Sequence, residues 1–323
     1  MSNSPYKEDI LKDRFEAQTL KLRDDYEGMV TATLIRRLPE SKSDKAVLYI
    51  HGFNDYFFQS EMARRFNDHG FNFYAIDLRK YGRSFLTHQK FNDIRNLKDY
   101  YEEIFQSLDI IRSEGNKETL LFGHSTGGLI VTLFAKDHTD SKLFDGLILN
   151  SPFYEFNLVK RVKKLLPLVS FAGRFIPKVT ISGGFSEEYG KSIHKSYRGE
   201  WDYILDWKPN LAPKINLGWL RAIHKAQSEL KKTFYISKPT LVLHSARSVA
   251  DIKNMEQVSS CDAILNVNDI ERIAHNIKGD VEVLSIQGGL HDLILSGTEV
   301  RNNVYNIIFE WINEIGCDKG RSL

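Results

Sequence analysis

The stretch ETLLFGHSTGGLIVTLFA, Glu118 to Ala135, sets one serine among glycines at the junction of two apolar segments. TLLF (119–122) is a short apolar run typical of a buried strand, and the segment from Leu129 to Lys136 has a helical composition. Between them lies the pattern G-x-S-x-G. In that context the pattern predicts a sharp turn that projects the Ser125 hydroxyl from a sheet edge, while the glycines let strand and helix approach closely. The alternative interpretation is a glycine-rich turn between strand and helix that has no catalytic role.

The segments around this turn predict an α/β fold with a mostly parallel sheet. Strands are expected at 17–22, 29–37, 45–50, 71–76, 119–122, 143–150, 238–244 and 280–286. Helices are expected at 57–69, 94–114, 129–136, 269–278 and 300–315. Strands that alternate with helices imply right-handed crossovers between parallel strands, with the helices covering the sheet.

The alternation stops between Pro152 and about Ser237, and three of the four tryptophans fall in that interval. We therefore expect a core built from residues 1–152 and 238–323, with residues 153–237 inserted as a helical cap over the carboxyl ends of the strands. The polar start of the chain, roughly its first 15 residues, is expected to be a loose arm.

Composition excludes several function classes. The chain carries 44 basic and 42 acidic residues, a balance that argues against binding nucleic acid through its phosphates. Cys261 and Cys317 form no C-x-x-C pair, which favours a reduced, cytoplasmic protein.

No apolar run reaches 18 residues and the N-terminus has no apolar signal region, so neither a membrane span nor a signal peptide is expected. No metal-binding motif such as H-E-x-x-H occurs, and the oligomeric state is left open.

A serine hydroxyl needs a base that is itself held by an acid before it becomes a strong nucleophile. In a sheet of this type the expected chain order is serine, acid, histidine. His291 follows the last expected strand and is the predicted base. The acid lies in the long loop after strand 238–244, where Asp262 is favoured over Asp251. Asp269 is expected to cap or begin the next helix.

The negative charge that develops during acyl transfer needs two N–H donors. The motif predicts one from Thr126, directly after the serine, and one from the loop after strand 45–50, where Phe53 follows His51-Gly52. His51 lies beside this proposed donor, and its alternative role is to brace its own loop through hydrogen bonds. The aromatic residues of this loop suit an apolar pocket and core packing equally well; they are Phe53, Tyr56, Phe57 and Phe58.

Four segments in this order, LYIHGF, AIDLRKYGRS, LFGHSTGG and GGLHD, resemble the alpha/beta-hydrolase fold. Within it the chain is similar to the monoacylglycerol lipase and lysophospholipase-like serine hydrolases, whose insertion forms a helical cap. The resemblance implies hydrolysis of a carboxylic ester through an acyl-enzyme on Ser125, with no metal or organic cofactor. Lys80 replaces the first glycine of the family's D-x-R-G-x-G-x-S pattern, so this loop is expected to sit differently.

The start of the expected cap has an apolar stripe with basic residues beside it. The stripe comprises Leu158, Val159, Val162, Leu165 and Leu166, and the basic residues are Lys160, Arg161, Lys163 and Lys164. One interpretation is a face that contacts lipid or a fatty acyl chain transiently. The other is a helix packed on the core with a solvated basic side. Pro167 is expected to end or kink this helix.

A small-molecule ester with an apolar acyl group is therefore the expected substrate. An aminopeptidase-like hydrolase of amides is the alternative, with Glu187-Glu188 as the acids that would bind a free amine. An acyltransferase of the same fold is a further alternative, since it differs from a hydrolase only in the molecule that accepts the acyl group. A slowly turning-over ligand-binding protein is the alternative from another class, although a strained nucleophile turn argues against it.

Overall fold

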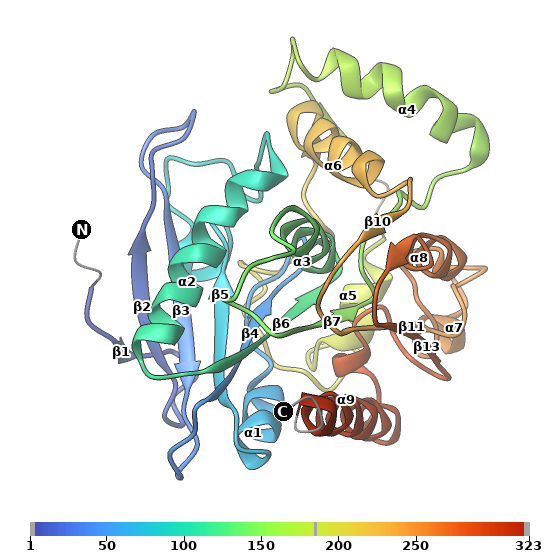
Figure 1. Cartoon of the computed structure of the whole chain (residues 1–323). Helices are drawn as coiled ribbons and strands as arrows, with labels where there is room; N and C mark the ends of the chain where they lie inside the picture. The colour runs from blue at the N-terminus through green and yellow to red at the C-terminus, as the bar shows by residue number, and fades with distance from the viewer. Residues whose placement is uncertain (1–3, 184–185, 320–323) are drawn as a thin grey trace.

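The structure is a computed structural model that describes residues 4–183 and 186–319, and its centre is a nine-stranded sheet (Figure 1). The sheet order is β1-β2-β3-β5-β4-β6-β7-β11-β13. The three pairs β1/β2, β2/β3 and β3/β5 are antiparallel, and the other pairs are parallel. The strands are β1 Lys7–Glu8, β2 Glu16–Lys21, β3 Thr31–Arg37, β4 Lys45–Ile50, β5 Asn72–Asp77, β6 Glu118–His124, β7 Gly146–Asn150, β11 Thr240–Ser245 and β13 Val281–Ile286. The predicted α/β class with a mostly parallel sheet is confirmed.

Helices cover both faces of this sheet. One face packs against α1 (Ser60–Asp68) and α9 (Thr298–Lys319), and the other against α2 (Tyr101–Ser113), α3 (Thr126–Asp137) and α8 (Val267–Ala274). Successive side chains of a strand point to opposite faces. In β4, Val47 and Tyr49 accordingly join the core under α1 and α9, while Leu48 joins the core under α2 and α3. A strand buried on both faces explains why the apolar runs are continuous rather than alternating.

Some helix ends differ from the predicted ones for local reasons. The first helix begins at Ser60 rather than at residue 57, because the Phe57 amide donates to Asp77 Oδ1 over 2.8 Å. Asn266, not Asp269, caps α8, since its side chain accepts from the Asn268 amide. Asp269 lies in the first turn of α8 instead.

The prediction of a loose N-terminal arm is wrong for residues 4–15. The short strand β1 pairs with β2, and Asp9 is buried. The Asp9 carboxylate accepts two hydrogen bonds from the Arg83 guanidinium, at 2.7 and 2.8 Å. A polar segment is therefore held in place by a buried ion pair that its composition does not reveal.

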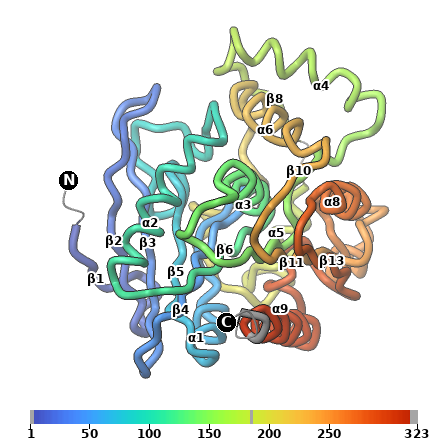
Figure 2. Tube along the Cα trace, in the orientation of Figure 1, coloured from blue at the N-terminus to red at the C-terminus, as the bar shows by residue number. Residues whose placement is uncertain are grey.

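Outside residues 184–185, the segment between β7 and β11 contains three helices and three two-residue strands. They are α4 Lys160–Ala172, β8 Thr180–Ile181, α5 Glu188–Ile193, β9 Ile215–Asn216, α6 Leu217–Glu229 and β10 Phe234–Tyr235. Both views place α4 at the outer edge of the molecule, beside α6 (Figure 1, Figure 2). α4 continues through Pro167 to Ala172, so of the two expected effects of Pro167, an end or a kink, the end of the helix does not occur.

The loop after β11 carries α7 (Met255–Val258), and β12 (Ile277–Lys278) pairs with β10. No helix within residues 4–183 and 186–319 has both the length and the apolar character that crossing a bilayer requires.

Candidate active site

Ser125 sits on a strained turn between β6 and α3. Its backbone has φ 51° and ψ −114°, a conformation that non-glycine residues rarely adopt. The two glycines of the pentad are needed for space. A Cβ on Gly127 would lie 2.2 Å from the Ile50 carbonyl oxygen, and one on Gly123 would lie 2.6 Å from the Gly127 carbonyl oxygen. The glycines therefore let α3 start directly against β4 and β6, which holds the serine at the sheet edge.

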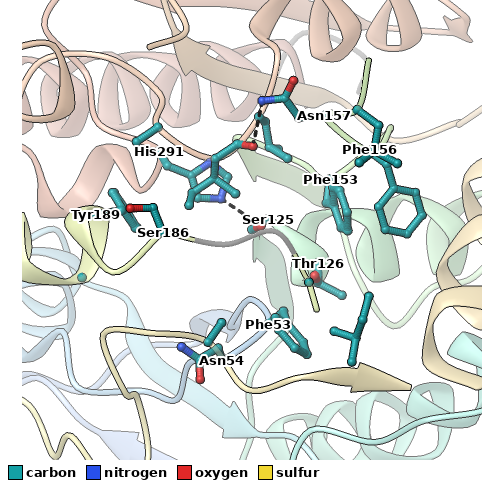
Figure 3. Close-up of a pocket in the computed structure, with 18 of the residues that line it drawn as sticks. Phe53, Asn54, Ser125, Thr126, Phe153, Phe156, Asn157, Ser186, Tyr189 and His291 are labelled. Atoms are coloured by element: carbon teal, nitrogen blue, oxygen red, sulfur yellow. Dashed lines mark hydrogen bonds between the residues drawn. The ribbon is translucent and has the colours of Figure 1, made fainter. Parts of the chain in front are cut away.

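His291 reaches this serine from the loop after β13. Its Nε2 lies 2.9 Å from Ser125 Oγ (Figure 3). The loop turns tightly because Gly288 takes a positive φ of 70°. With Nδ1 protonated and bonded to a carboxylate, Nε2 is the acceptor that faces the serine hydroxyl.

That carboxylate belongs to Asp262, whose Oδ2 lies 2.9 Å from His291 Nδ1. Its other oxygen accepts from the backbone amides of Ile264 and Leu265, at 2.8 and 2.7 Å. Asp262 is buried and its backbone bonds to the first part of the loop, through Arg247 and Val249. Asp251 is exposed and accepts from the Lys253 amide, so the structure brings Asp262 and not Asp251 to the histidine.

The loop after β4 lies directly beside the serine. A Cβ on Gly52 would be 3.1 Å from Ser125 Cβ, which places the following residue, Phe53, at the same point of the sheet edge. Thr126 is the first residue of α3, so its amide belongs to the group of N–H donors at a helix N-terminus. Both residues line the cavity over the serine.

His51 braces this loop through both ring nitrogens. Its Nδ1 lies 2.8 Å from the Gly52 carbonyl oxygen, and its Nε2 accepts from the Leu78 amide over 3.0 Å. Burial lowers the pKa of His51, although the nearby carboxylates of Asp77 and Asp55 act in the opposite direction. The neutral ring therefore donates at Nδ1 and accepts at Nε2, which ties the end of β4 to the end of β5.

Two further residues, Asn150 and Tyr189, which the sequence analysis missed, hold the histidine loop. Asn150, at the end of β7, donates from Nδ2 to Asp292 Oδ1 over 2.7 Å and accepts from the Leu293 amide over 3.3 Å. The Tyr189 hydroxyl accepts from the Asp292 amide over 2.9 Å. The signal for Asn150 is a polar residue at the carboxyl end of a buried parallel strand, the edge where such folds place their sites.

A buried polar cluster lies beneath the histidine. Asp55, His124 and Asp292 offer ligand atoms within 4.8 Å of one another. Burial lowers the pKa of His124, and the neighbouring Asp292 carboxylate opposes this shift. Lys208, from the inserted segment, lies 2.8 Å from Asp55 Oδ1. Its ammonium group offsets the charge of Asp55, one of the two buried carboxylates of this cluster.

A cavity of about 750 Å³ opens over Ser125 and His291 (Figure 3). This volume falls within the usual range for small-molecule sites. Apolar side chains dominate one part of the lining, among them Phe53, Phe153, Phe156, Leu166, Trp219 and Leu220. The lining also includes polar residues, among them Asn54, Asp55, Ser186, Lys208 and Asn210.

Of the four aromatic residues in the loop after β4, Phe53 lines the cavity and packs on Trp219, with ring centroids 4.6 Å apart. Phe57 belongs to the core under α1 and α9. Tyr56 and Phe58 pack against aromatic residues of the inserted segment. One residue of this group therefore shapes the cavity, and the others stabilise the loop.

Lys80 keeps the loop conformation that a glycine would adopt. Its φ is 68°, and its fully buried ammonium group lies 2.6 Å from Asp25 and 2.7 Å from Glu27. A strained backbone conformation is thus held by two ion pairs. The next turn is also crowded, because a Cβ on Gly82 would lie 2.5 Å from the Asp77 carboxylate.

The fold is that of an alpha/beta hydrolase, and Ser125, His291 and Asp262 lie in hydrogen-bonded series at its sheet edge. The family model described as serine aminopeptidase, S33, matches residues 41–296 of the 323-residue chain. The chain therefore belongs to this hydrolase family. No curated protein matches the chain significantly.

Several solved structures share the fold. A soluble variant of monoglyceride lipase from Saccharomyces cerevisiae, in complex with a substrate analog, has a TM-score of 0.70 at 19% identity, covering 97% of this chain and 99% of that one. Monoacylglycerol lipase from Paleococcus ferrophilus has a TM-score of 0.64 at 18% identity, covering 87% and 99%. A thermophilic esterase from Thermogutta terrifontis has a TM-score of 0.56 at 19% identity, covering 92% and 99%.

Proposed function

We propose that the protein is a serine hydrolase that cleaves carboxylic esters with an apolar acyl group. The observation that carries this proposal is the hydrogen-bonded series from Ser125 Oγ through His291 to Asp262, with 2.9 Å at each step, at the floor of a largely apolar cavity. The lipase and esterase descriptions of structurally similar proteins agree with it.

In the first half-reaction, Ser125 Oγ attacks the ester carbonyl carbon while His291 Nε2 takes the hydroxyl proton. Asp262 keeps the imidazole in the required tautomer and stabilises the imidazolium that forms. The amides of Phe53 and Thr126 donate to the developing oxyanion. The ester C–O bond then breaks, the leaving alkoxide takes the proton from His291, and the acyl group remains on Ser125.

In the second half-reaction, His291 removes a proton from a water molecule, which attacks the acyl carbon. The Ser125 Oγ–acyl bond breaks, and the serine recovers its proton from His291. A carboxylic acid leaves and the enzyme is regenerated. An alcohol in place of this water would make the same site an acyltransferase.

We propose further that residues 153–237 act as a cap that encloses the acyl group. Phe153, Phe156, Leu166, Trp219 and Leu220 supply most of the apolar lining named above and all belong to this segment. Apolar contact of this kind binds the acyl chain by removing its surface from water. The polar part of the lining, near Lys208, suits the alcohol side of the ester.

The family description favours peptide hydrolysis as the alternative. A free amine would need an uncompensated acid in the cavity. Glu187 is paired with Lys191 at 2.5 Å and Glu188 with Arg198 at 2.6 Å, and neither lines the cavity. Asp55 is already paired with Lys208. Asp251 also lines the cavity and has no ion-pair partner among the described residues, so it is the acid that could bind a free amine. The apolar lining is therefore the observation that favours the ester over the aminopeptidase substrate.

The test is hydrolysis of p-nitrophenyl esters from acetate to palmitate, beside amino-acid p-nitroanilides and with Ser125→Ala as the control. We expect ester turnover that depends on Ser125 and rises with acyl length until the cavity is filled. Faster turnover of the anilides would replace the ester proposal by the peptidase one. Labelling of Ser125 by a fluorophosphonate without turnover of any substrate would favour a ligand-binding protein.

We also propose a cytoplasmic location, supported by the use of only two cysteines without a C-x-x-C pair. Cys261 is a free, buried thiol, and the Cys317 side chain lies outside the described residues. Fractionation of cells that express the protein tests this proposal.

A further inference from the structure

Three side chains from separate segments of the chain converge beneath His291. Asp55 lies in the loop after β4, His124 ends β6, and Asp292 follows His291 in the loop after β13. They expose only 1%, 5% and 2% of their surface, and each offers one metal-ligating atom within 4.8 Å of those of the other two. We call these residues the 55/124/292 cluster. Because they lie on separate segments, no short motif in the sequence predicts them as a site.

In each member of the cluster, one polar atom is already held by the protein. Asp55 Oδ1 accepts from Lys208 Nζ over 2.8 Å, and Asp292 Oδ1 accepts from Asn150 Nδ2 over 2.7 Å. His124 Nδ1 lies 3.2 Å from the Asn150 carbonyl oxygen, which can only accept, so this nitrogen carries the ring proton. Hydrogen bonds of this kind orient the carboxylates and imidazoles that bind metal ions in proteins.

The other polar atom of each member is an acceptor. Asp55 Oδ2 and Asp292 Oδ2 are buried and have no hydrogen-bond partner in the described part of the chain. Burial lowers the pKa of His124, so the ring is neutral and Nε2 carries a lone pair. This Nε2 lies 3.9 Å from Asp292 Oδ2, which is too far for a hydrogen bond. Buried acceptors that face one another cost free energy unless a cation or a proton donor lies between them.

The donor atoms of the cluster select the kind of cation. One imidazole nitrogen and two carboxylate oxygens suit zinc and similar divalent transition metals, whereas calcium and magnesium prefer oxygen ligands alone. The Lys208 ammonium group offsets only one of the two carboxylates, so a negative charge remains to attract a cation. Asp55 and His124 also line the cavity. The cavity therefore gives an ion a path from solvent and leaves a coordination position for water.

We infer that Asp55, His124 and Asp292 bind one divalent transition-metal ion of the zinc type. The ring centroids of His124 and His291 are 5.0 Å apart, so the bound ion places its positive charge beside His291. This charge opposes the imidazolium that forms on His291 in the proposed reaction. The ion is therefore an inhibitor of hydrolysis and not a cofactor. The inhibition rests on the proposed function, whereas the binding of the ion does not.

The test of binding is equilibrium dialysis of the whole, chelator-treated chain against zinc chloride, with the metal content measured by mass spectrometry. We expect one zinc ion per chain. Asp55→Asn and Asp292→Asn should each bind zinc at least about tenfold more weakly, because a neutral amide of the same shape replaces a carboxylate ligand. Titration with cobalt chloride should give a visible absorption band that both variants lose.

Two control variants locate the ion within the cavity. Asp251→Asn removes an exposed carboxylate that also lines the cavity, and it should bind zinc like the unaltered protein. His291→Gln removes the other imidazole of the lining, and it should keep its zinc. Urea unfolding midpoints establish that every variant is folded.

The test of inhibition is hydrolysis of p-nitrophenyl acetate by the unaltered protein with and without zinc. We expect saturating zinc to lower the rate at least about tenfold, because two like charges oppose each other at short distance. Excess EDTA should restore the rate. The residual rate of Asp292→Asn should not respond to the same zinc concentration.

Three results would overturn the metal site. The unaltered protein binds no zinc, or zinc binds equally well to Asp55→Asn and Asp292→Asn and is an adventitious ion only. In the third, His291→Gln loses zinc while the two cluster variants keep it, so the ion sits on the Ser125/His291/Asp262 series. Zinc binding with an unchanged rate of hydrolysis would retain the site and overturn the inhibition. Zinc binding without any ester hydrolysis would retain the site and overturn only the proposed function.

Discussion

Asn150 and Asp292 join the two loops of the site, since Asn150 Nδ2 donates to Asp292 Oδ1 over 2.7 Å. The Asn150 carbonyl oxygen also accepts from the Ser125 amide over 3.0 Å. One residue at the end of β7 therefore contacts both the nucleophile turn and the loop that carries His291. This contact sets the distance between serine and histidine through the sheet rather than through either loop alone.

Asn150→Ala should lower kcat for ester hydrolysis by roughly 10- to 100-fold with little change in KM. A lost buried hydrogen bond costs about 1–3 kcal/mol when its partner is left unsatisfied, and here that loss releases the histidine loop. Steady-state kinetics measure the change in kcat, and the rate of fluorophosphonate labelling measures the reactivity of Ser125. Asn268→Ala is the control, because Asn268 is exposed. An unchanged kcat in Asn150→Ala would show that the histidine loop keeps its conformation without this hydrogen bond.

Asp262→Asn should lower kcat by roughly 10³- to 10⁴-fold, because the amide no longer holds His291 in the tautomer that accepts from the serine. Asp251→Asn is the matched control, since Asp251 lies in the same loop and is exposed. Equal steady-state rates for the unaltered protein and Asp251→Asn are expected. If Asp251→Asn proved the more damaging change, the acid assignment would be wrong.

Lys80→Met should destabilise the fold by about 3–5 kcal/mol, because two carboxylates lose a buried cation. Lys117→Met removes an ion pair with Asp44 that is exposed and screened by solvent, so its urea midpoint should stay close to that of the unaltered protein. Urea unfolding at neutral pH measures both. Equal costs would mean that the buried pairs at Lys80 contribute no more than a surface pair.

Acidification should reduce stability partly through His51, whose pKa is lowered by burial. Below about pH 6.5 the unfolded chain takes up a proton that the folded His51 does not, so the free energy of unfolding falls by at most about 1.4 kcal/mol per pH unit. The loss of stability continues as the pH falls to the pKa of His51 in the folded protein. Above the pKa of His51 in the unfolded chain there is no such loss.

His51→Gln cannot titrate at this position. It should be less stable at neutral pH, because its hydrogen bonds to Gly52 and Leu78 are altered. Its stability should nevertheless fall less steeply than that of the unaltered protein as the pH is lowered from 7 to 5.5. Urea unfolding across this interval provides the slopes, and parallel slopes would contradict the assignment of this proton uptake to His51.

Eight of the nine described strands of the sheet, all except β1, and the turn at Ser125 could be predicted from the sequence, because they depend on short local patterns. A buried strand, a glycine pair and a following helix are encoded within the stretch 118–135. Likewise, His291 directly follows the last strand, so its approach to the serine follows from strand order.

Contacts between distant segments were not predictable in this way. Asn150 and Asp292 are 142 residues apart, and Asp55 and Lys208 are 153 apart. The ordered N-terminus depends on Arg83, 74 residues from its partner Asp9. Local composition describes each partner as an ordinary polar residue, and only the tertiary fold makes it a buried pair.

The choice between Asp262 and Asp251 is an intermediate case. Both lie in one loop, and the decision depends on a backbone bridge between Ser248 and Asp262 that folds the loop back on itself. The apolar stripe expected at the start of the cap is a similar case. Leu166 is buried while Val162 and Leu165 are exposed at the cavity, a direction that depends on where α4 meets α6.

The most direct test of ester hydrolysis through Ser125 is intact-mass and peptide mass spectrometry of the protein quenched during turnover of p-nitrophenyl palmitate. We expect a palmitoyl adduct on the peptide that contains Ser125, formed at a rate that matches the release of p-nitrophenol and absent in Ser125→Ala. Release of p-nitrophenol at an unchanged rate by Ser125→Ala, or an adduct confined to another residue, would contradict the account.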